Sequence, residues 1–253
     1  STNQGNFFVK WNDTKKHPGM FEAEAKGLKM LKNSREIYIP EVIGTTEEGG
    51  LSFFILEFIE SGKKWTSFFE DFGKRLAKLH CHSHEKFGLD HDNYIGSLPQ
   101  SNKQHDNWVD FFVEERLDKQ IKLARDSGAI PNSMIRPFQS LYNHFNEIFP
   151  VEKPSLLHGD LWSGNFMAGA DGNACIIDPA AYYGFREMDI AMSKLFGGFP
   201  EEFYDSYNDE FPMEQGWRER VDICNLYPLM VHVNLFGGGY INDVQNILKR
   251  FWW

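Results

Sequence analysis

Asp160, Asn165 and Asp178 are the residues of this 253-residue chain whose types and spacing could carry out chemistry. The first two belong to the segment H-G-D-L-W-S-G-N, and Asp178 follows the apolar run A-C-I-I further along the chain. Carboxylate and amide oxygens bind Mg²⁺, and a carboxylate can also accept the proton of an attacking hydroxyl. The set is typical of phosphoryl transfer, with Asp160 as general base and Asn165 and Asp178 as Mg²⁺ ligands.

A phosphotransferase also needs groups that hold ATP, and the N-terminal part of the chain offers them in a suitable order. Lys10 lies in an expected strand and Glu24 in an expected helix. In kinases a strand lysine contacts the α- and β-phosphates and a helix glutamate orients the lysine. Glu22 is an alternative partner, but Glu24 precedes Leu28 and Leu31 by four and seven residues, which places it nearer the inward face.

The segment I-L-E-F-I-E-S-G, residues 55–62, is expected to border the adenine ring. Glu57 would offer its carbonyl oxygen and Ile59 its N–H.

Each of these site residues alone has an ordinary interpretation, because an Asp and an Asn in one loop most often make turns and a lone strand lysine is most often solvated. The ordered combination of all these residues favours a kinase.

Two other polar features favour structural roles. Asp189 begins an apolar helix, and we expect it to support loop N–H groups from behind rather than to act as a third catalytic acid. His80 and His84 could share a helix face as metal ligands, but no third ligand is apparent, so packing at a helix end is favoured. The G-G-G-Y segment at 237–240 follows a helical pattern and not a strand, which favours a helix end over a phosphate loop.

These residues require a small sheet with one helix, followed by a mostly helical part. We expect an α+β, two-lobed protein, with the N-lobe and its terminal hinge at 1–60 and a helical C-lobe at 61–253. In the N-lobe, strands are expected at 7–11, 37–43 and 51–59 and a helix at 19–32. In the C-lobe, helical patterns cover 65–80, 107–127, 134–149, the region from 188, 216–236 and 243–253. Short strands at 155–158, 166–168 and 174–177 suggest a hairpin that carries the polar loops.

Composition narrows the possible partners and compartments. Hydrophobic residues make up 42% of the chain, which is typical of a packed globule. The formal charge of -10 and the absence of a basic cluster argue against nucleic acid binding. Cys81, Cys175 and Cys224 match no metal or disulfide pattern, and no apolar run is long enough for a membrane span. We therefore expect a cytoplasmic location, without a membrane or nucleic acid partner.

With these residues in place, the chain resembles the fructosamine kinase family, also called ketosamine 3-kinases, which is related to aminoglycoside phosphotransferases and choline kinases. The similarity extends from F-F-V-K and M-F-E-A-E-A-K-G-L to the C-terminal tail. The segments most particular to the family are I-D-P-A-A-Y-Y-G-F-R-E-M-D-I-A-M, L-F-G-G-F-P and N-L-F-G-G-G-Y. The motif H-G-D-x-x-x-x-N alone would indicate only the wider phosphotransferase group.

The resemblance implies a protein-kinase-like fold that uses ATP and Mg²⁺ to phosphorylate the C3 hydroxyl of a ketosamine, either free or on a protein lysine. The resulting phosphate is unstable in this family, so the sugar is lost and the amine is regenerated. By position, Asp160 matches the catalytic aspartate, Asn165 and Asp178 the metal ligands, and Lys10 with Glu24 the nucleotide ion pair. Aromatic residues could form a wall for the sugar or the lysine stem, namely Trp162, Tyr182, Tyr183, Trp217 and Tyr240.

One departure from the family leaves alternatives open. The family has a glycine-containing hairpin over the ATP phosphates before the F-F-V-K strand, and the sequence as given has no such segment, so we expect a truncated N-lobe sheet. If the hairpin were absent from the protein, phosphate positioning would suffer. A kinase for another small hydroxylated amine, of the aminoglycoside or choline type, and a non-catalytic protein with this fold are the alternatives. The oligomeric state cannot be derived from the sequence.

Overall fold

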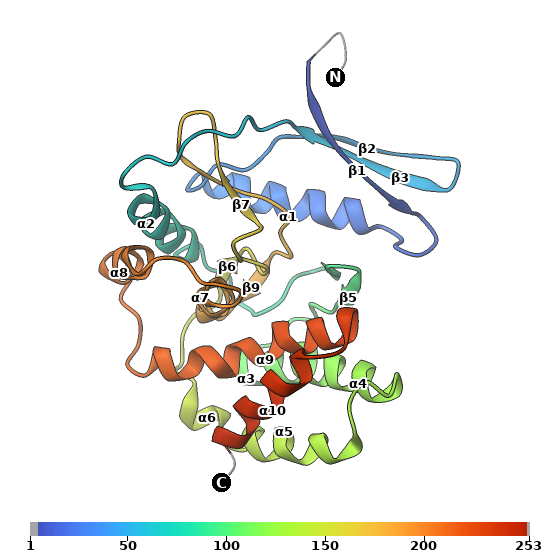
Figure 1. Cartoon of the computed structure of the whole chain (residues 1–253), viewed down its shortest axis with the longest axis vertical. Coiled ribbons are helices and arrows are strands. Elements are labelled where there is room, and N and C mark those ends of the chain that lie inside the picture. Colours follow the sequence, from blue (N-terminus) through green and yellow to red (C-terminus); the bar gives the residue numbers. More distant parts are fainter. Residues whose placement is uncertain (1–4, 252–253) are drawn as a thin grey trace.

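A small antiparallel sheet opens the chain in the computed structural model, which describes residues 5–251. Its strands follow the order β1-β3-β2 and comprise β1 (Phe7–Asp13), β2 (Val42–Glu48) and β3 (Leu51–Glu57). Helix α1 (Met20–Ser34) lies against one face of this sheet, below it in Figure 1. In β3, Phe54 and Leu56 are buried on that face, and the ring of Phe54 stacks on Phe21 of α1 with centroids 5.4 Å apart.

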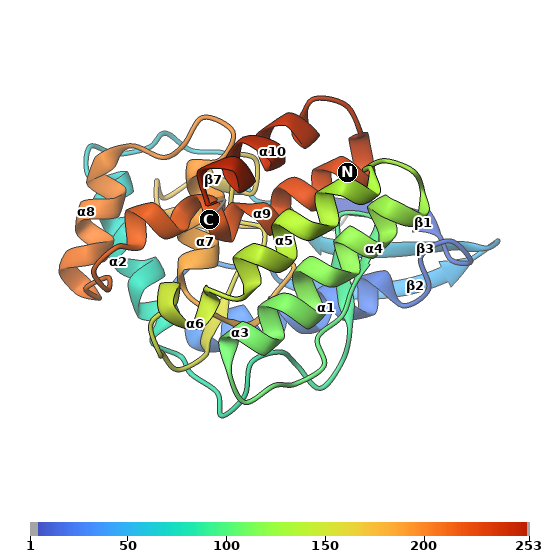
Figure 2. The same cartoon turned by 90° about the horizontal axis from the view of Figure 1, so that it is seen from below.

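The rest of the described chain is mainly helical. Its helical segments are α2 (Phe68–His80), α3 (Trp108–Phe111), the π-helical η1 (Phe112–Leu117), α4 (Asp118–Asp126), the 3-10 turn η2 (Asn132–Met134), α5 (Ile135–Tyr142), α6 (Phe145–Ile148), α7 (Glu187–Lys194), α8 (Glu201–Glu210), α9 (Trp217–Phe236) and α10 (Tyr240–Arg250). Seen from below in Figure 2, α4, α5, α9 and α10 cover the end of the molecule opposite the sheet. Helix α9 packs against α4, α7 and α10.

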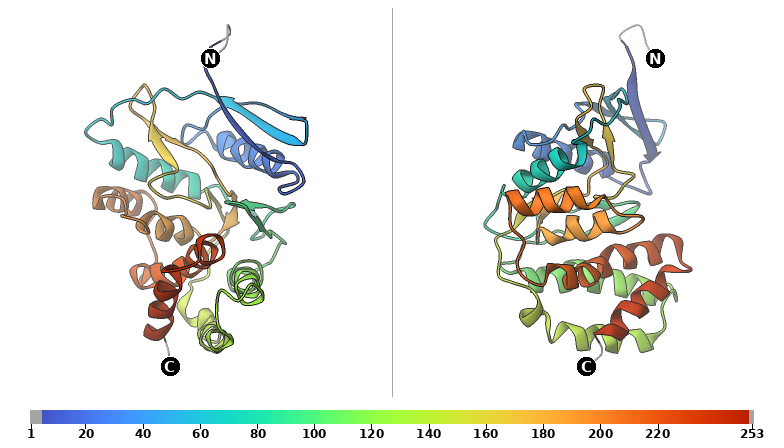
Figure 3. Two further views of the ribbon diagram at one scale, coloured as in Figure 1. Left: turned by 45° about the vertical axis from the view of Figure 1, so that its right-hand side comes forward. Right: turned by 60° about the vertical axis from the view of Figure 1, so that its left-hand side comes forward.

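Short strand pairs follow the sheet along the chain; the first two named below lie between the sheet and the lower helices, and the last rises beside α1 in both views of Figure 3. They are β4 (Asn93–Ile95) with β5 (Leu98–Gln100), β6 (Ser155–Leu157) with β9 (Tyr182–Gly184), and β7 (Phe166–Ala168) with β8 (Ala174–Ile176). The predicted hairpin is confirmed in β7 and β8. Strand β6 does not join it and pairs with β9, so the polar loops hang from two strand pairs.

Some expected elements were misplaced. The strand expected at 37–43 forms as β2 from Val42 onward, because Pro40 lacks an N–H and interrupts strand pairing. Ile37 and Ile39, which suggested the strand, are buried in the core but lie outside β2. The helix expected at 134–149 is broken into α5 and α6, and the hairpin β4–β5 and strand β9 were not predicted.

The buried apolar side chains of residues 5–251 form two clusters. One joins the sheet and α1 to α2 and α8, so that Leu28 and Phe54 share a cluster with Phe72 and Phe203. The other fills the space among the lower helices and includes Phe112 and the middle of α9. The α+β class is as expected. The lobe boundary expected at residue 60 stays a prediction, and the first apolar cluster contains residues from both sides of it. None of the described helices combines the length and apolar content that crossing a membrane requires.

Candidate active site

Lys10 of β1 and Glu24 of α1 form an ion pair beneath the sheet. Lys10 is the cross-strand partner of Phe54, so its side chain leaves β1 on the face that α1 covers. Its Nζ lies 2.7 Å from Oε1 of Glu24 and 2.6 Å from Oδ1 of Asp178. Burial alone would lower the pKa of Lys10, but the two carboxylates raise it above its usual value, so the lysine is a cation. The expected choice of Glu24 over Glu22 as the partner of Lys10 is confirmed.

The loop between β6 and β7 carries Asp160 and Asn165. The Nδ2 group of Asn165 donates to Oδ2 of Asp160 at 3.0 Å and to the Asp160 carbonyl at 2.9 Å, which fixes the carboxylate in the loop. Burial raises the pKa of Asp160 to about 7; the hydrogen bond from Asn165 opposes this shift, and the charges of Asp189 and Asp178 add to it. A carboxylate with this pKa is suited to accept a proton near neutral pH.

Asp178 follows β8 and is bonded to the same loop through its neighbour. The N–H of Ile177 donates to the carbonyl of Asn165 at 3.0 Å, and the carbonyl of Ile177 accepts from Nε2 of His158 at 2.9 Å. Asp178 itself has a left-handed backbone with φ 56°, which costs a non-glycine residue roughly 1 kcal/mol. These bonds hold the Asp178 backbone against the Asp160 loop.

Asp189 of α7 supports the Asp160 loop from behind. Its carboxylate accepts the N–H of His158 at 2.7 Å and that of Gly159 at 2.9 Å, and Nε2 of His80 lies 3.2 Å from it. Burial would raise the pKa of Asp189, but the hydrogen bond from His80 and the nearby His158 lower it overall, so the group is ionised. The expected supporting role of Asp189 is confirmed.

His80 and His84 do not share a site. His80 is 1% exposed and uses its other ring nitrogen to bond the hydroxyl of Tyr207 at 2.8 Å. His84 is exposed and stacks on Tyr183, with ring centroids 4.8 Å apart. The packing interpretation of this histidine pair therefore holds.

Two neighbouring cavities border these residues. The first, of about 290 Å³, is lined by Lys10, Glu24, Asp160, Trp162, Asn165 and Asp178 together with residues 179–181. The second, of about 340 Å³, is mainly apolar and is lined by Phe8, Pro40, Leu56, Glu57, Phe58, Ile59, Ser61, Met167, Ile177 and Asp178. Asp178 lines both cavities, so a molecule in the second cavity could reach the charged groups of the first.

The expected aromatic wall is only partly in place. Trp162 lines the first cavity, and its ring centroid lies 6.1 Å from that of Phe196. The Phe196 centroid in turn lies 6.2 Å from that of Tyr240. Tyr182 is 1% exposed and belongs to the core, so the prediction that it contacts a substrate is wrong. Trp217 lies against Lys194 at 5.5 Å and is not part of either cavity wall.

The hairpin β4–β5 lies beside the first cavity and was not predicted from the sequence. Asn93 of β4 lines this cavity and donates to the carbonyl of Ala181 at 2.9 Å. Gln100 of β5 donates to the carbonyl of Ala180 at 3.1 Å. The signal was available, because Gly96-Ser97 between two short apolar runs is typical of a two-residue hairpin turn.

Comparison with known proteins is consistent with this site. Residues 1–252 match the family model for fructosamine kinase. A protein of Enterococcus faecium named "Probable ketoamine kinase" is 42% identical over 241 residues, covering 92% of this chain and 83% of the relative. The chloroplastic protein-ribulosamine 3-kinase of Arabidopsis thaliana is 39% identical over 256 residues, covering 99% of this chain and 77% of the relative.

Solved structures show the same relationship and define the fold. A protein of Haemophilus somnus described as a fructosamine-3-kinase superposes with a TM-score of 0.88 at 34% identity, over 98% of this chain and 84% of that one. An aminoglycoside phosphotransferase superposes with a TM-score of 0.63 at 13% identity, over 99% of this chain and 89% of that one, which shows a shared fold alone. The fold is therefore that of the protein-kinase-like phosphotransferases, and the chain belongs to the fructosamine kinase family.

Proposed function

We propose that this protein transfers the γ-phosphoryl group of ATP to the C3 hydroxyl of a ketosamine, with Asp160 as the general base. The observation that carries the proposal is the half-buried carboxylate of Asp160, whose pKa is raised to about 7, in one cavity with Lys10, Asn165 and Asp178. The hydroxyl oxygen attacks the γ-phosphorus, its proton passes to Asp160, and ADP departs with the electrons of the broken P–O bond.

The nucleotide would occupy the second cavity and extend past Asp178. Its apolar lining suits adenine, and the Glu57 carbonyl and the Ile59 N–H are the backbone groups that would bond the edge of the ring. The Glu57 carboxylate accepts hydrogen bonds from the Tyr38 hydroxyl at 2.6 Å and from the Glu41 N–H at 2.9 Å. These bonds give the Glu57 side chain a structural role, so only its backbone carbonyl would contact the nucleotide. The cation of Lys10, oriented by Glu24, would then contact the phosphates.

The donor set beside Asp160 fits Mg²⁺. Asn165 turns its Nδ2 group toward Asp160, which leaves its Oδ1 as a ligand atom, and the Asp178 side chain is 44% exposed. Hard oxygen donors next to a phosphate site are what Mg²⁺ prefers. When bound, Mg²⁺ would neutralise charge on the ATP phosphates, and Asn165 and Asp178 would hold it.

The acceptor would lie beside Trp162, on the Asp160 side of the first cavity. From Trp162 an aromatic cluster leads away from the cavity through Phe196, which is 37% exposed, to His232 and Tyr240. We propose that this cluster holds the hydrocarbon stem of a protein-bound lysine. If so, Phe196→Ala should raise the KM for a ketosamine peptide several-fold and leave the KM for ATP unchanged. Equal effects on both KM values would reject this placement.

Loss of the sugar after phosphorylation would regenerate the amine, so the proposed role is the repair of glycated lysines. The described cysteines are free thiols, which supports a reducing compartment such as the cytoplasm.

A substrate panel tests the proposal. The protein is incubated with ATP and Mg²⁺ and, in separate reactions, ribulosyl-lysine, fructosyl-lysine, an aminoglycoside and choline, and ADP is measured. We expect ADP and a sugar phosphate with the ketosamines, and an Asp160→Asn variant should remove this turnover. Turnover of only the aminoglycoside or choline would replace ketosamines as the substrate class. Absence of turnover with all four compounds would favour a non-catalytic binding protein with this fold.

A further inference from the structure

The peptide of Ala180 connects the Asp160 loop to a hairpin that has no catalytic group. Its N–H donates to the carbonyl of His158 at 3.0 Å, and its carbonyl accepts from Nε2 of Gln100 at 3.1 Å. The next carbonyl, of Ala181, accepts from Nδ2 of Asn93 at 2.9 Å. The backbone two and three residues after Asp178 is therefore held by two amide side chains of the β4–β5 hairpin.

These amides belong to a buried polar network. Oδ1 of Asn93 accepts from Gln100 and from Asn102, each at 2.8 Å. Oδ1 of Asn102 accepts from a guanidinium N–H of Arg116 at 2.8 Å, and Oε1 of Gln100 accepts from the Tyr227 hydroxyl at 2.6 Å. All five side chains are at most 6% exposed. A buried network whose members bond one another fixes each member in one orientation.

Arg116 anchors this network through stacking. It is fully buried and, among residues 5–251, forms no ion pair with a carboxylate. Its guanidinium carbon lies 4.0 Å from the ring centroid of Tyr182 and 4.5 Å from that of Phe111. The cation lies against both rings and also donates to the carbonyls of Ser101 and Glu115, a combination that lysine would not reproduce. Tyr182 therefore supports the network from the core.

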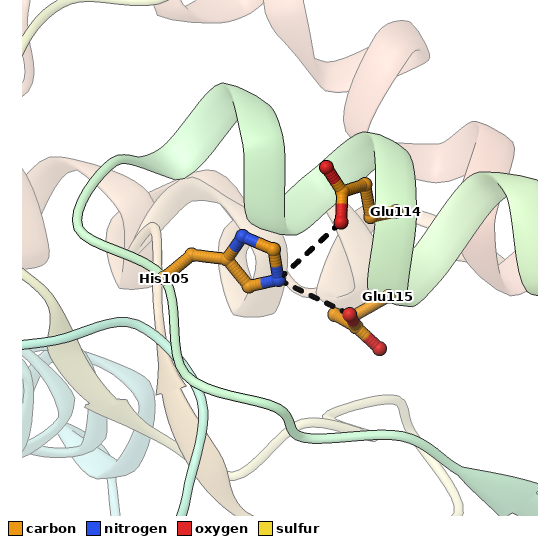
Figure 4. A group of neighbouring side chains, drawn as sticks. All are labelled: His105, Glu114 and Glu115. Carbon is orange, nitrogen blue, oxygen red and sulfur yellow. Dashed lines mark hydrogen bonds and ion pairs between the residues drawn. The ribbon is translucent and has the colours of Figure 1, made fainter.

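The outer end of the network is the group His105, Glu114 and Glu115 shown in Figure 4. Nε2 of His105 lies 3.1 Å from Glu115, whose other oxygen accepts from the Ser101 hydroxyl. The carbonyl of Ser101 in turn accepts from Arg116. These three residues could surround a cation, but the Glu115 oxygens already accept hydrogen bonds from His105 and Ser101. We therefore assign the group to the structure of the π-helical turn η1, which buries Glu115 and Arg116 side by side.

We propose that Gln100 and Asn93, backed by Asn102 and Arg116, are positioning residues for Asp178. Asp178 has a left-handed backbone, so the chain on either side must hold it there. On one side the Ile177 peptide bonds to Asn165 and His158, and on the other the network holds the carbonyls of Ala180 and Ala181. The inference rests on the proposed function, in which Asp178 is a metal ligand.

The test uses Mn²⁺ as the probe, with its binding in the presence of saturating AMP-PNP followed by electron paramagnetic resonance. Gln100→Met removes the donor to Ala180 and also leaves the Tyr227 hydroxyl without its acceptor. The double variant Gln100→Met/Tyr227→Phe removes that hydroxyl as well, which should recover the part of the thermal stability that was lost through the unpaired Tyr227 donor, while the Ala180 carbonyl still lacks its Gln100 donor. We expect both variants to bind Mn²⁺ about 10-fold more weakly than the parent protein.

The double variant separates positioning from stability. If Gln100 acted only on stability, the double variant would regain both its melting temperature and its Mn²⁺ affinity. Asn234→Leu is the matched control, since it also replaces an amide by an uncharged apolar side chain, and Asn234 donates from Nδ2 to a backbone carbonyl, that of Gln120 at 3.0 Å, away from Ala180. We expect this control to bind Mn²⁺ as the parent protein does. Parental affinity in both Gln100 variants would overturn the positioning role alone, whereas absence of nucleotide-dependent Mn²⁺ binding by the parent protein would overturn the proposed metal site as well.

Discussion

Replacement of Asp160 by asparagine should stabilise the free protein while removing its activity. The pKa of Asp160 is raised from its usual 3.8 to about 7, mainly by burial. Between these two pH values the unfolded chain has already released a proton that the folded protein still holds, so stability falls as pH rises through this window. Above pH 7 the folded protein carries a charge that is partly removed from water, which an amide of the same shape lacks.

The size of the effect follows from the pKa difference. A shift of about three pKa units, at about 1.4 kcal/mol per unit, sets an upper limit of about 4 kcal/mol on the gain at pH 8. Asp160 borders a cavity that water can enter, so we expect about 1–2 kcal/mol, or a rise in melting temperature of about 2–8 °C. At pH 5 the gain should be less than half as large, because the folded protein is then mostly protonated at this site.

The assay is thermal unfolding without nucleotide at pH 5 and pH 8, followed by circular dichroism. Asp209→Asn serves as the control, because Asp209 is exposed on α8 and its replacement removes the same charge from the surface. We expect a pH-dependent gain for Asp160→Asn and little change for the control. A loss of stability at pH 8, or an equal gain at both pH values, would refute the idea that the folded protein holds Asp160 as an unfavourable charge.

Three further predictions concern the groups around Asp160. In the free enzyme kcat/KM should fall about tenfold per pH unit below pH 7, because the base must be deprotonated, and a flat profile between pH 5 and 7 would argue against Asp160 as the base. Lys10→Met should weaken ATP binding about 10- to 100-fold, as the loss of a charge-assisted contact implies, and calorimetry would contradict the assignment if affinity were unchanged. Asp189→Ala should lower the free energy of unfolding by about 3–5 kcal/mol, because it leaves two loop N–H groups and His80 without their acceptor. Urea unfolding measures this loss, and a value below about 1 kcal/mol would show that water replaces the carboxylate.

The neighbouring positions of Asp160 and Asn165 could be predicted from the sequence because their contact is local. Asp160 and Asn165 lie five positions apart on one loop, and their mutual hydrogen bond follows from that spacing. Lys10 and Glu24 were found through the expected strand and helix, whose relative placement is set by the packing of α1 on the sheet. For these residues, secondary structure and order along the chain were sufficient.

The aromatic residues and the hairpin show where sequence reasoning stopped. Tyr182 and Trp162 are both aromatic residues near the motif, yet one is in the core and the other lines the cavity. That difference depends on the pairing of β6 with β9, which brings together segments about 27 positions apart. The roles of Asn93 and Gln100 likewise depend on hydrogen bonds to Ala180 and Ala181, whose long separation along the chain leaves no periodic signal.

The most direct test of the central claim is the steady-state phosphorylation of ribulosyl-lysine by the parent protein and by Asp160→Asn, with ATP affinity measured in parallel. We expect a sugar 3-phosphate by phosphorus NMR with the parent protein. For the variant we expect a kcat/KM that is lower by about 10²- to 10⁴-fold, with ATP affinity within a few-fold of the parent value. Transfer to the ketosamine at a parental rate by Asp160→Asn would contradict the role of Asp160 as the general base.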